Sequence, residues 1–234
     1  MGEHTLSVIK QNIRKVQSRI NEAARRAGRD PSEISLVAVT KTVPVEKIKE
    51  AISAGICVFG ENYVQEAKKK IEHIGKDVVK WHMIGHLQTN KAKDATILFD
   101  MIETVDRVKL ADVLDQKAAS RDKTLDVLVQ VNLSGEASKS GVRPDEALSL
   151  VDFVMNKMNL RFRGLMTIPP YFEDPERTRP YFARLRRLGE EIRSNYPGLK
   201  TFELSMGMSG DFEVAIEEGA TIVRIGTAIF GPRD

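Results

Sequence analysis

Eight short apolar runs alternate with longer amphipathic segments along most of this chain, and this alternation constrains the fold more than any other feature of the sequence. Such a pattern is typical of parallel βα units, and eight of these units can close into a barrel. The predicted strands cover residues 35–40, 56–60, 78–85, 99–105, 125–132, 160–168, 201–207 and 221–231.

We therefore predict one α/β domain over residues 1–234, a single (β/α)8 TIM barrel with an extra N-terminal helix. The extra helix falls within residues 5–30, where apolar residues recur at spacings of three and four. A doubly wound open sheet is the alternative. The glycine-rich dinucleotide fingerprint of that fold is missing after the first run, which continues as TKTVPVEK.

Composition and charge indicate a globular protein whose main partner is neither nucleic acid nor a membrane. Hydrophobic residues make up 41% and charged residues 29% of the chain, as in ordinary globular proteins. A net charge of +3 gives too weak a field for nucleic acid or an anionic membrane to be the main partner. No apolar run approaches the ~20 residues of a spanning helix, and the N-terminus lacks the apolar core of a signal peptide. We expect a cytoplasmic monomer.

Cysteine and histidine give no sign of a reactive or metal site. The single cysteine, Cys57, lies among Ile56, Val58 and Phe59, which predicts a buried, inert thiol. His82 and His86 have a spacing that binds zinc on a helix. In a strand the same spacing separates them by ~13 Å, so we expect core or pocket-wall histidines and no metal.

Residues at the ends of three predicted strands suggest a site for a phosphorylated carbonyl compound. Lys41 follows the first run in LVAVTKTVP, at the barrel rim where reactive groups project. Ser209 lies in SMGMSGDF after the seventh run, and Gly226 and Thr227 lie in RIGTAIFG at the end of the eighth. Loops after strands seven and eight form the usual phosphate site of this fold. A solvated lysine and ordinary glycine turns are the alternative interpretation.

Arg224 interrupts the apolar run TIVRIG, where a guanidinium needs a partner. That partner is either a carboxylate or the ring nitrogen of a ligand. An imine-forming lysine beside a phosphate cradle fits two chemistries, a pyridoxal phosphate (PLP) site and a sugar-phosphate Schiff-base aldolase.

The segments LVAVTKTVP, FGENYVQEAKKK, WHMIGHLQTNK, VQVNLSGEASKSG, GLMTIPP and LSMGMSGDFEVAIEEGATIVRIGTAIFG resemble successive motifs of the pyridoxal phosphate homeostasis protein family, also called the proline synthetase co-transcribed homologue family. The fold of that family is similar to the N-terminal barrel of alanine racemase. The resemblance extends in order from about the first helix to Gly231.

The resemblance implies that Lys41 holds PLP as an internal aldimine, that Arg224 faces the pyridine nitrogen, and that no residue is catalytic. The implied cofactor-binding set is Lys41, Asn62, Met166, Ser205, Met208, Ser209, Arg224, Gly226 and Thr227. Of these, Ser209, Gly226 and Thr227 would bind the phosphate, Ser205 and Met208 would shape its loop, and Asn62 and Met166 would line the pocket.

Two other positions, 43 and 139, correspond to lysines in the family, and this chain keeps a lysine only at the second. Val43 stands where many relatives have a second lysine, so no role of that amine carries over. Lys139 matches another family lysine near the pocket mouth, and it could accept or relay PLP. An ordinary solvated loop lysine is the alternative for Lys139.

Arginine at the pyridine nitrogen stays charged and can only donate a hydrogen bond, which weakens carbanion chemistry on the ring. Alanine racemase keeps such an arginine but takes its second base from another domain across a dimer, and this chain ends three residues after Gly231. We expect a noncatalytic PLP-binding protein of vitamin B6 homeostasis that passes PLP to apo-enzymes. A racemase-like enzyme and an interaction module using the basic N-terminal helix are the alternatives.

Overall fold

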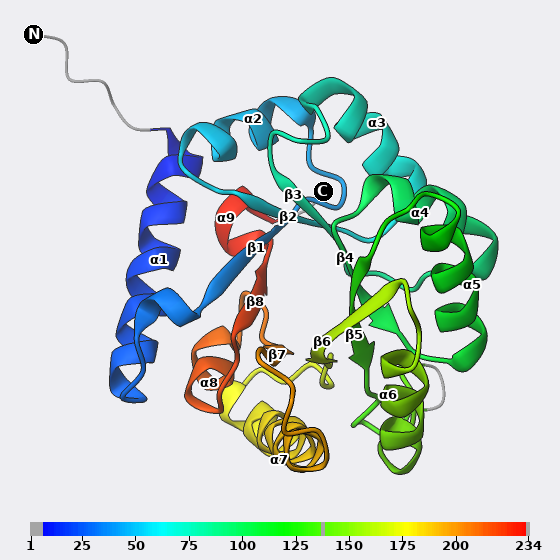
Figure 1. The fold of residues 1–234 in the computed structure, drawn as a ribbon. Coiled ribbons are helices and arrows are strands. Elements are labelled where there is room, and N and C mark those ends of the chain that lie inside the picture. The colour runs from blue at the N-terminus through cyan, green and yellow to red at the C-terminus, as the bar shows by residue number, and fades with distance from the viewer. Residues whose placement is uncertain (1–6, 137–138, 233–234) are drawn as a thin grey trace, which may run out of the picture.

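The computed structural model describes residues 7–136 and 139–232 and shows eight parallel strands closed into one barrel (Figure 1). The strands follow one another around the barrel in chain order, and β1 pairs with β8 to close it. This confirms the predicted TIM-barrel fold and rules out the open sheet. The strands are β1 (Ser35–Val39), β2 (Val58–Glu61), β3 (Lys80–Met83), β4 (Met101–Val105), β5 (Leu125–Gln130), β6 (Leu160–Met166), β7 (Glu203–Ser205) and β8 (Ile222–Ile225).

Helices surround the barrel, one after each strand (Figure 1). They are α2 (Val45–Ser53), α3 (Val64–Ile74), α4 (Ala92–Leu98), α5 (Val108–Ala119), α6 (Ala147–Met155), α7 (Arg179–Asn195), α8 (Phe212–Glu217) and the short α9 (Thr227–Phe230), with α1 (Val8–Arg26) in front of β1. Short 3-10 helices occupy Pro31–Glu33, Thr89–Lys91, Pro144–Glu146 and Pro175–Thr178. Within the described ranges, none of the helices is long and apolar enough to cross a bilayer.

The extra helix α1 begins at a serine cap, where the Ser7 hydroxyl accepts a hydrogen bond from the Lys10 amide at 3.3 Å. Its apolar stripe is buried against α8 and α9. Part of its basic face is paired, because Arg19 contacts Glu213 of α8 at 3.0 Å and Arg26 contacts Glu217 at 3.0 Å. The charges of α1 therefore stabilise its attachment to the barrel.

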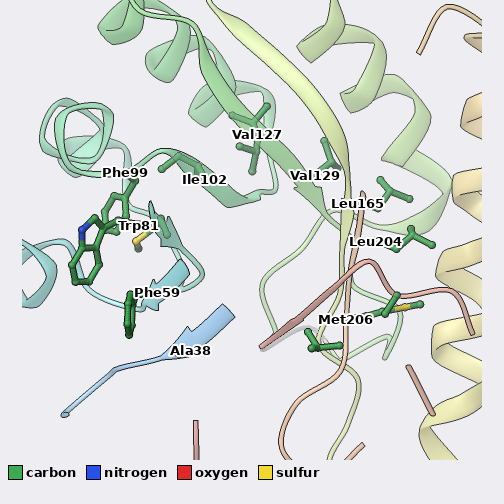
Figure 2. Close-up of a cluster of buried hydrophobic side chains, with 14 of the residues drawn as sticks. Ala38, Phe59, Trp81, Phe99, Ile102, Val127, Val129, Leu165, Leu204 and Met206 are labelled. Carbon is green, nitrogen blue, oxygen red and sulfur yellow. The ribbon is translucent and has the colours of Figure 1, made fainter. Parts of the chain in front are cut away.

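Alternating strand residues build two separate cores, as expected for a barrel. One set faces the helices and forms the larger core, part of which Figure 2 shows, with Phe59 and Trp81 rings 5.7 Å apart. The other set fills the barrel interior with a small apolar cluster, made of Val37, Met101, Leu128, Met166 and Ile222. Residues two positions further along these strands lie nearer the C-terminal rim.

Two sequence expectations were wrong. The eighth predicted strand, residues 221–231, ends at Ile225, and the segment after Gly226 turns into α9. Cys57, which we expected to be buried, is exposed, because β2 begins only at Val58 and Cys57 lies in the preceding turn. Its thiol is 3.4 Å from the carbonyl oxygen of Gly55.

Gly164 allows β6 to pair with both neighbouring strands. The register between β5 and β6 shifts by one residue before Gly164, which has a φ of +144°. A Cβ at this position would lie 2.0 Å from the carbonyl oxygen of Glu203 on β7. Only glycine fits this β-bulge without moving a strand.

We expect Gly164→Ala to lower the free energy of unfolding by about 3 kcal/mol or more, because it combines overpacking with an unfavourable backbone angle. Urea unfolding followed by Trp81 fluorescence would measure the change. Gly198→Ala is the control, since a Cβ there meets nothing within 4 Å, and it should change stability by no more than about 0.5 kcal/mol. Equal stability of the two variants would contradict this account of the bulge.

Candidate functional site

A pocket of about 260 Å³ opens at the C-terminal rim of the barrel, between the ends of β1 and β8 and the loops that follow β6 and β7. The structure brings five residues of the predicted site together in its wall, namely Met208, Ser209, Arg224, Gly226 and Thr227. Small-molecule sites in barrels occupy this rim. The pocket is therefore the leading candidate for a ligand site.

Lys41 lies beside this pocket because β1 is the hydrogen-bonded neighbour of β8. Ala38 pairs with Ile225, so the residues after both strands emerge at the same part of the rim. Val39 lines the pocket, and Val39, Thr42 and Gly226 line an adjoining hollow of about 210 Å³. Within the described residues, the side chain of Lys41 has no hydrogen bond or ion pair. Its amine is available to a ligand.

The loop after β7 is fixed in place by short-range contacts. Gly207 has a φ of +92°, and a Cβ there would lie 2.6 Å from the Ala215 Cβ, so glycine lets the loop pack on α8. The Asp211 carboxylate accepts a hydrogen bond from the Met208 amide at 2.6 Å. The Ser209 hydroxyl accepts one from the Ala228 amide at 3.3 Å, which connects this loop to the first turn of α9.

Arg224 is buried, with 3% of its surface exposed, and its guanidinium is held by the barrel interior. One terminal nitrogen donates to the Ser205 hydroxyl at 2.5 Å, and the other donates to the Thr167 carbonyl oxygen at 2.8 Å. Nη1 also lies 3.9 Å from the carboxylate of Glu103. Arg224 thus has a carboxylate partner, one of the two kinds of partner that its sequence position left open, and it lines the pocket as well.

Glu103 is the centre of a polar layer that separates the pocket from the apolar cluster in the barrel interior. It is fully buried, and its two carboxylate oxygens contact different groups. Oε1 lies 2.7 Å from Nδ1 of His82, and Oε2 accepts a hydrogen bond from Ser205 at 2.5 Å. Ser205 therefore lies beneath the pocket wall, between Glu103 and Arg224.

Three other sequence candidates lie outside the pocket wall. Met166 is fully buried in the apolar cluster of the barrel interior. Asn62 and Lys139 both line a separate hollow of about 200 Å³ at the rim, together with His86. The amine of Lys139 contacts the Glu136 carboxylate at 3.0 Å.

Sequence reasoning missed several residues around the pocket. Tyr171 and Phe172, in the loop after β6, line it, and so does Asp211. Glu103 could have been found, because it interrupts the apolar run FDMIETV in the same way that Arg224 interrupts TIVRIG. Nothing in the sequence around the two aromatic residues distinguishes them from an ordinary loop.

The histidines have separate surroundings. His82 is paired with Glu103, whereas Nδ1 of His86 lies 3.1 Å from the Ser140 hydroxyl. In the portion of the chain that the structure describes, no group of three His, Cys, Asp or Glu side chains could hold a metal ion.

Comparison with known proteins agrees with this fold. Residues 5–234 match the family model for the alanine racemase N-terminal domain. Pyridoxal phosphate homeostasis proteins of Aquifex aeolicus strain VF5 and Escherichia coli strain K12 are 46% and 43% identical to this chain, covering 95% and 97% of it and 97% of each relative.

A solved structure extends the likeness to three dimensions. PipY of Synechococcus elongatus PCC7942 with PLP bound is 34% identical and superposes with a TM-score of 0.84, over 95% of this chain and all of that one. Identity at this level over nearly the whole length shows common family membership. The chain belongs to the pyridoxal phosphate homeostasis protein family.

Proposed function

We propose that this chain binds PLP through a Schiff base on Lys41 and serves intracellular PLP homeostasis as a carrier, buffer or regulator with little or no turnover. The observation that carries the proposal is the β1–β8 register, which brings Lys41 to the rim of a pocket lined by Arg224, Ser209 and Thr227. The PLP-bound structure of PipY, a relative over the full chain, gives independent support.

The residues around the pocket suit the groups of PLP. The hydroxyls of Ser209 and Thr227 can donate to phosphate oxygens, and Gly226 lets a ligand approach the backbone where α9 begins. The surroundings of Lys41 support its place at the pocket rim, because Val39 before it lines the pocket and Thr42 after it lines the adjoining hollow. The lysine amine would condense with the aldehyde carbon, forming a C=N bond and releasing water.

Arg224 would weaken carbanion chemistry on a bound ring. Bound PLP supplies an electron sink, and that property depends on a proton at the ring nitrogen. A guanidinium has only donors and stays charged, so Arg224 would hold that nitrogen unprotonated. Glu103 is the counter-charge that keeps Arg224 charged in the barrel interior.

Glu103 is ionised despite its burial. Burial alone would raise the pKa of Glu103, but the hydrogen bond from His82, the charges of His82 and Arg224 and the hydrogen bond from Ser205 together lower it. Burial lowers the pKa of Arg224, while Glu103 and Asp211 act in the opposite direction. A guanidinium starts from so high a pKa that it remains protonated at neutral pH.

The remaining predicted residues would support the site either without contacting PLP directly or from the neighbouring rim. Ser205 would orient Arg224, and Met208 would shape the phosphate loop through the hydrogen bond that its backbone amide donates to Asp211. Met166 would support the floor of the barrel interior, and Asn62 would line the neighbouring part of the rim. For Lys139, a relay of PLP competes with its ion pair to Glu136.

The proposed function also includes the proteins that would receive PLP and the compartment in which the chain would act. A carrier must release its cargo, and Tyr171, 84% exposed at the pocket wall, shows that this pocket reaches the surface. We infer a monomer in the cytoplasm that delivers PLP to PLP-dependent apo-enzymes.

The Schiff base predicts a covalent assay. Purified protein titrated with PLP should turn yellow, and borohydride should fix the cofactor on Lys41, as mass spectrometry of the peptides would show. Lys41→Ala should stay colourless and unlabelled. Lys47→Ala is a matched control, because this lysine lines the adjoining hollow. Lys47→Ala protein should turn yellow and be labelled on Lys41 as the wild type is. Wild-type protein that remains colourless with added PLP would contradict the proposal.

Turnover can be tested by proton exchange. Holo-protein incubated with L-amino acids in heavy water should leave the α-proton in place, as NMR would show, because Arg224 disfavours a carbanion next to the ring. Steady exchange that disappears in Lys41→Ala would favour the racemase-like alternative.

The lowered pKa of Glu103 predicts acid sensitivity. A carboxylate with a folded-state pKa below its unfolded value of about 4.5 contributes stability above that value and loses it as the pH falls toward the folded pKa. The free energy of unfolding should therefore fall below about pH 4.5. Glu103→Gln should cost about 3–5 kcal/mol at neutral pH, since it breaks a buried pair, and the gap to wild type should shrink on acidification. A constant gap at all pH values would contradict this.

A further inference from the structure

Lys70 of α3 is a buried lysine, with 6% of its surface exposed, although its neighbours Lys68 and Lys69 are exposed on the same helix. Its ammonium has three donors, and all three have partners. Nζ lies 2.5 Å from the carbonyl oxygen of Thr40, 2.7 Å from Oε1 of Glu61 and 2.7 Å from Oε1 of Glu66. Lysine is almost never buried unless it is paired in this way.

The Lys70 cluster, which we define as Lys70, Glu61 and Glu66, holds the backbone on both sides of Lys41. Before Lys41, Thr40 accepts from Lys70 at its carbonyl oxygen and donates its hydroxyl to Glu61 at 2.5 Å. After Lys41, the Thr42 amide donates to Oε1 of Glu66 at 2.6 Å. Thr40 and Thr42 are the two covalent neighbours of Lys41, so the cluster fixes both peptide links to it.

The conformation of Thr42 shows that this turn needs to be held. Its φ is +63°, in the left-handed region that β-branched residues strongly avoid. Such a conformation costs about 1–3 kcal/mol and persists where surrounding contacts determine it. The hydrogen bond from the Thr42 amide to Glu66 is one of those contacts.

The charges of the cluster depend on Lys70. Glu61 is fully buried and its pKa is raised, because burial outweighs the charge and the hydrogen bond of Lys70, both of which lower it. Without the ammonium, two carboxylates would share this region with no counter-charge, and the Thr40 carbonyl would lose its donor. The turn between β1 and α2 would then lose its anchor at the Thr40 carbonyl, and Glu66, which accepts from the Thr42 amide, would lose the ammonium that holds it.

We propose that Lys70, together with Glu61 and Glu66, is a positioning residue that sets the backbone around Lys41 so that its amine meets an aldehyde held in the pocket. This inference rests on the proposed function, because it assigns the cluster a role in forming the same Schiff base. None of the three partners of the Lys70 ammonium lines the pocket. Lys70 acts on Thr40 directly and on Thr42 through Glu66.

The test compares Lys70→Met with Lys69→Met, which removes an exposed lysine from the same helix. PLP titration followed by visible absorbance should give an apparent Kd about tenfold or more weaker for Lys70→Met, because a displaced reacting group costs at least this much. Borohydride labelling of Lys41 should slow by a similar factor. Lys69→Met should match wild type in both measurements.

A second pair of variants covers the case in which Lys70→Met does not fold. Glu66 is partly exposed, so its substitution is less disruptive. Glu66→Ala removes the acceptor of the Thr42 amide and should weaken PLP binding and slow labelling, whereas Glu66→Gln keeps an acceptor oxygen and should restore much of both. A structural role alone would lower the melting temperature and leave the absorbance, Kd and labelling rate unchanged.

The outcomes separate this inference from the proposed function. If wild type forms no borohydride-fixable adduct on Lys41, both are overturned. If wild type forms it, and the Lys70 and Glu66 variants form it with the same Kd and rate, only the positioning role is overturned. Weakened binding in Lys70→Met or Glu66→Ala, with recovery in Glu66→Gln, supports it.

Discussion

The parallel pairing of β1 with β8 is the interaction on which the rest of this structure depends. It closes the barrel, and it joins the first strand of the chain to the last. Through it, the turn that carries Lys41 becomes the neighbour of the segment from Arg224 to Thr227. The same closure brings α8 and α9 against α1, whose ion pairs to α8 reinforce it from outside. A single ladder of hydrogen bonds thus creates the rim pocket.

Beneath the pocket, the barrel interior changes from apolar to charged within two residues along a strand. Met101 and Ile222 belong to the apolar cluster, while Glu103 and Arg224 form the polar layer above it. An arginine could not be buried there without a carboxylate. The positive charge of Arg224 at the pocket therefore depends on Glu103. That carboxylate comes from β4, which contributes no residue to the pocket wall.

The order of the strands could be predicted from the sequence, and it located Lys41, Ser209, Arg224, Gly226 and Thr227 at one rim. Periodicity could not show that α9 begins directly after Gly226, because a helix of one turn has no periodic signal. It also could not assign Asn62 to a separate hollow or Met166 to the apolar cluster, since that depends on how strands are staggered around the barrel. In the run KKK of α3, nothing in the sequence distinguishes the last lysine from the other two, and the position of the Thr40 carbonyl shows why it is buried.

The absence of any linker between β8 and α9 has a consequence for which ligands can fit. Arg224 and Thr227 are separated by two residues, and both ends of this stretch are held, by Ser205 and Thr167 on one side and by the Ser209 contact to Ala228 on the other. The distance between the guanidinium and the start of α9 is thus built into the backbone. Under the proposed function, a rigid aromatic phosphate of matching length would reach both ends at once.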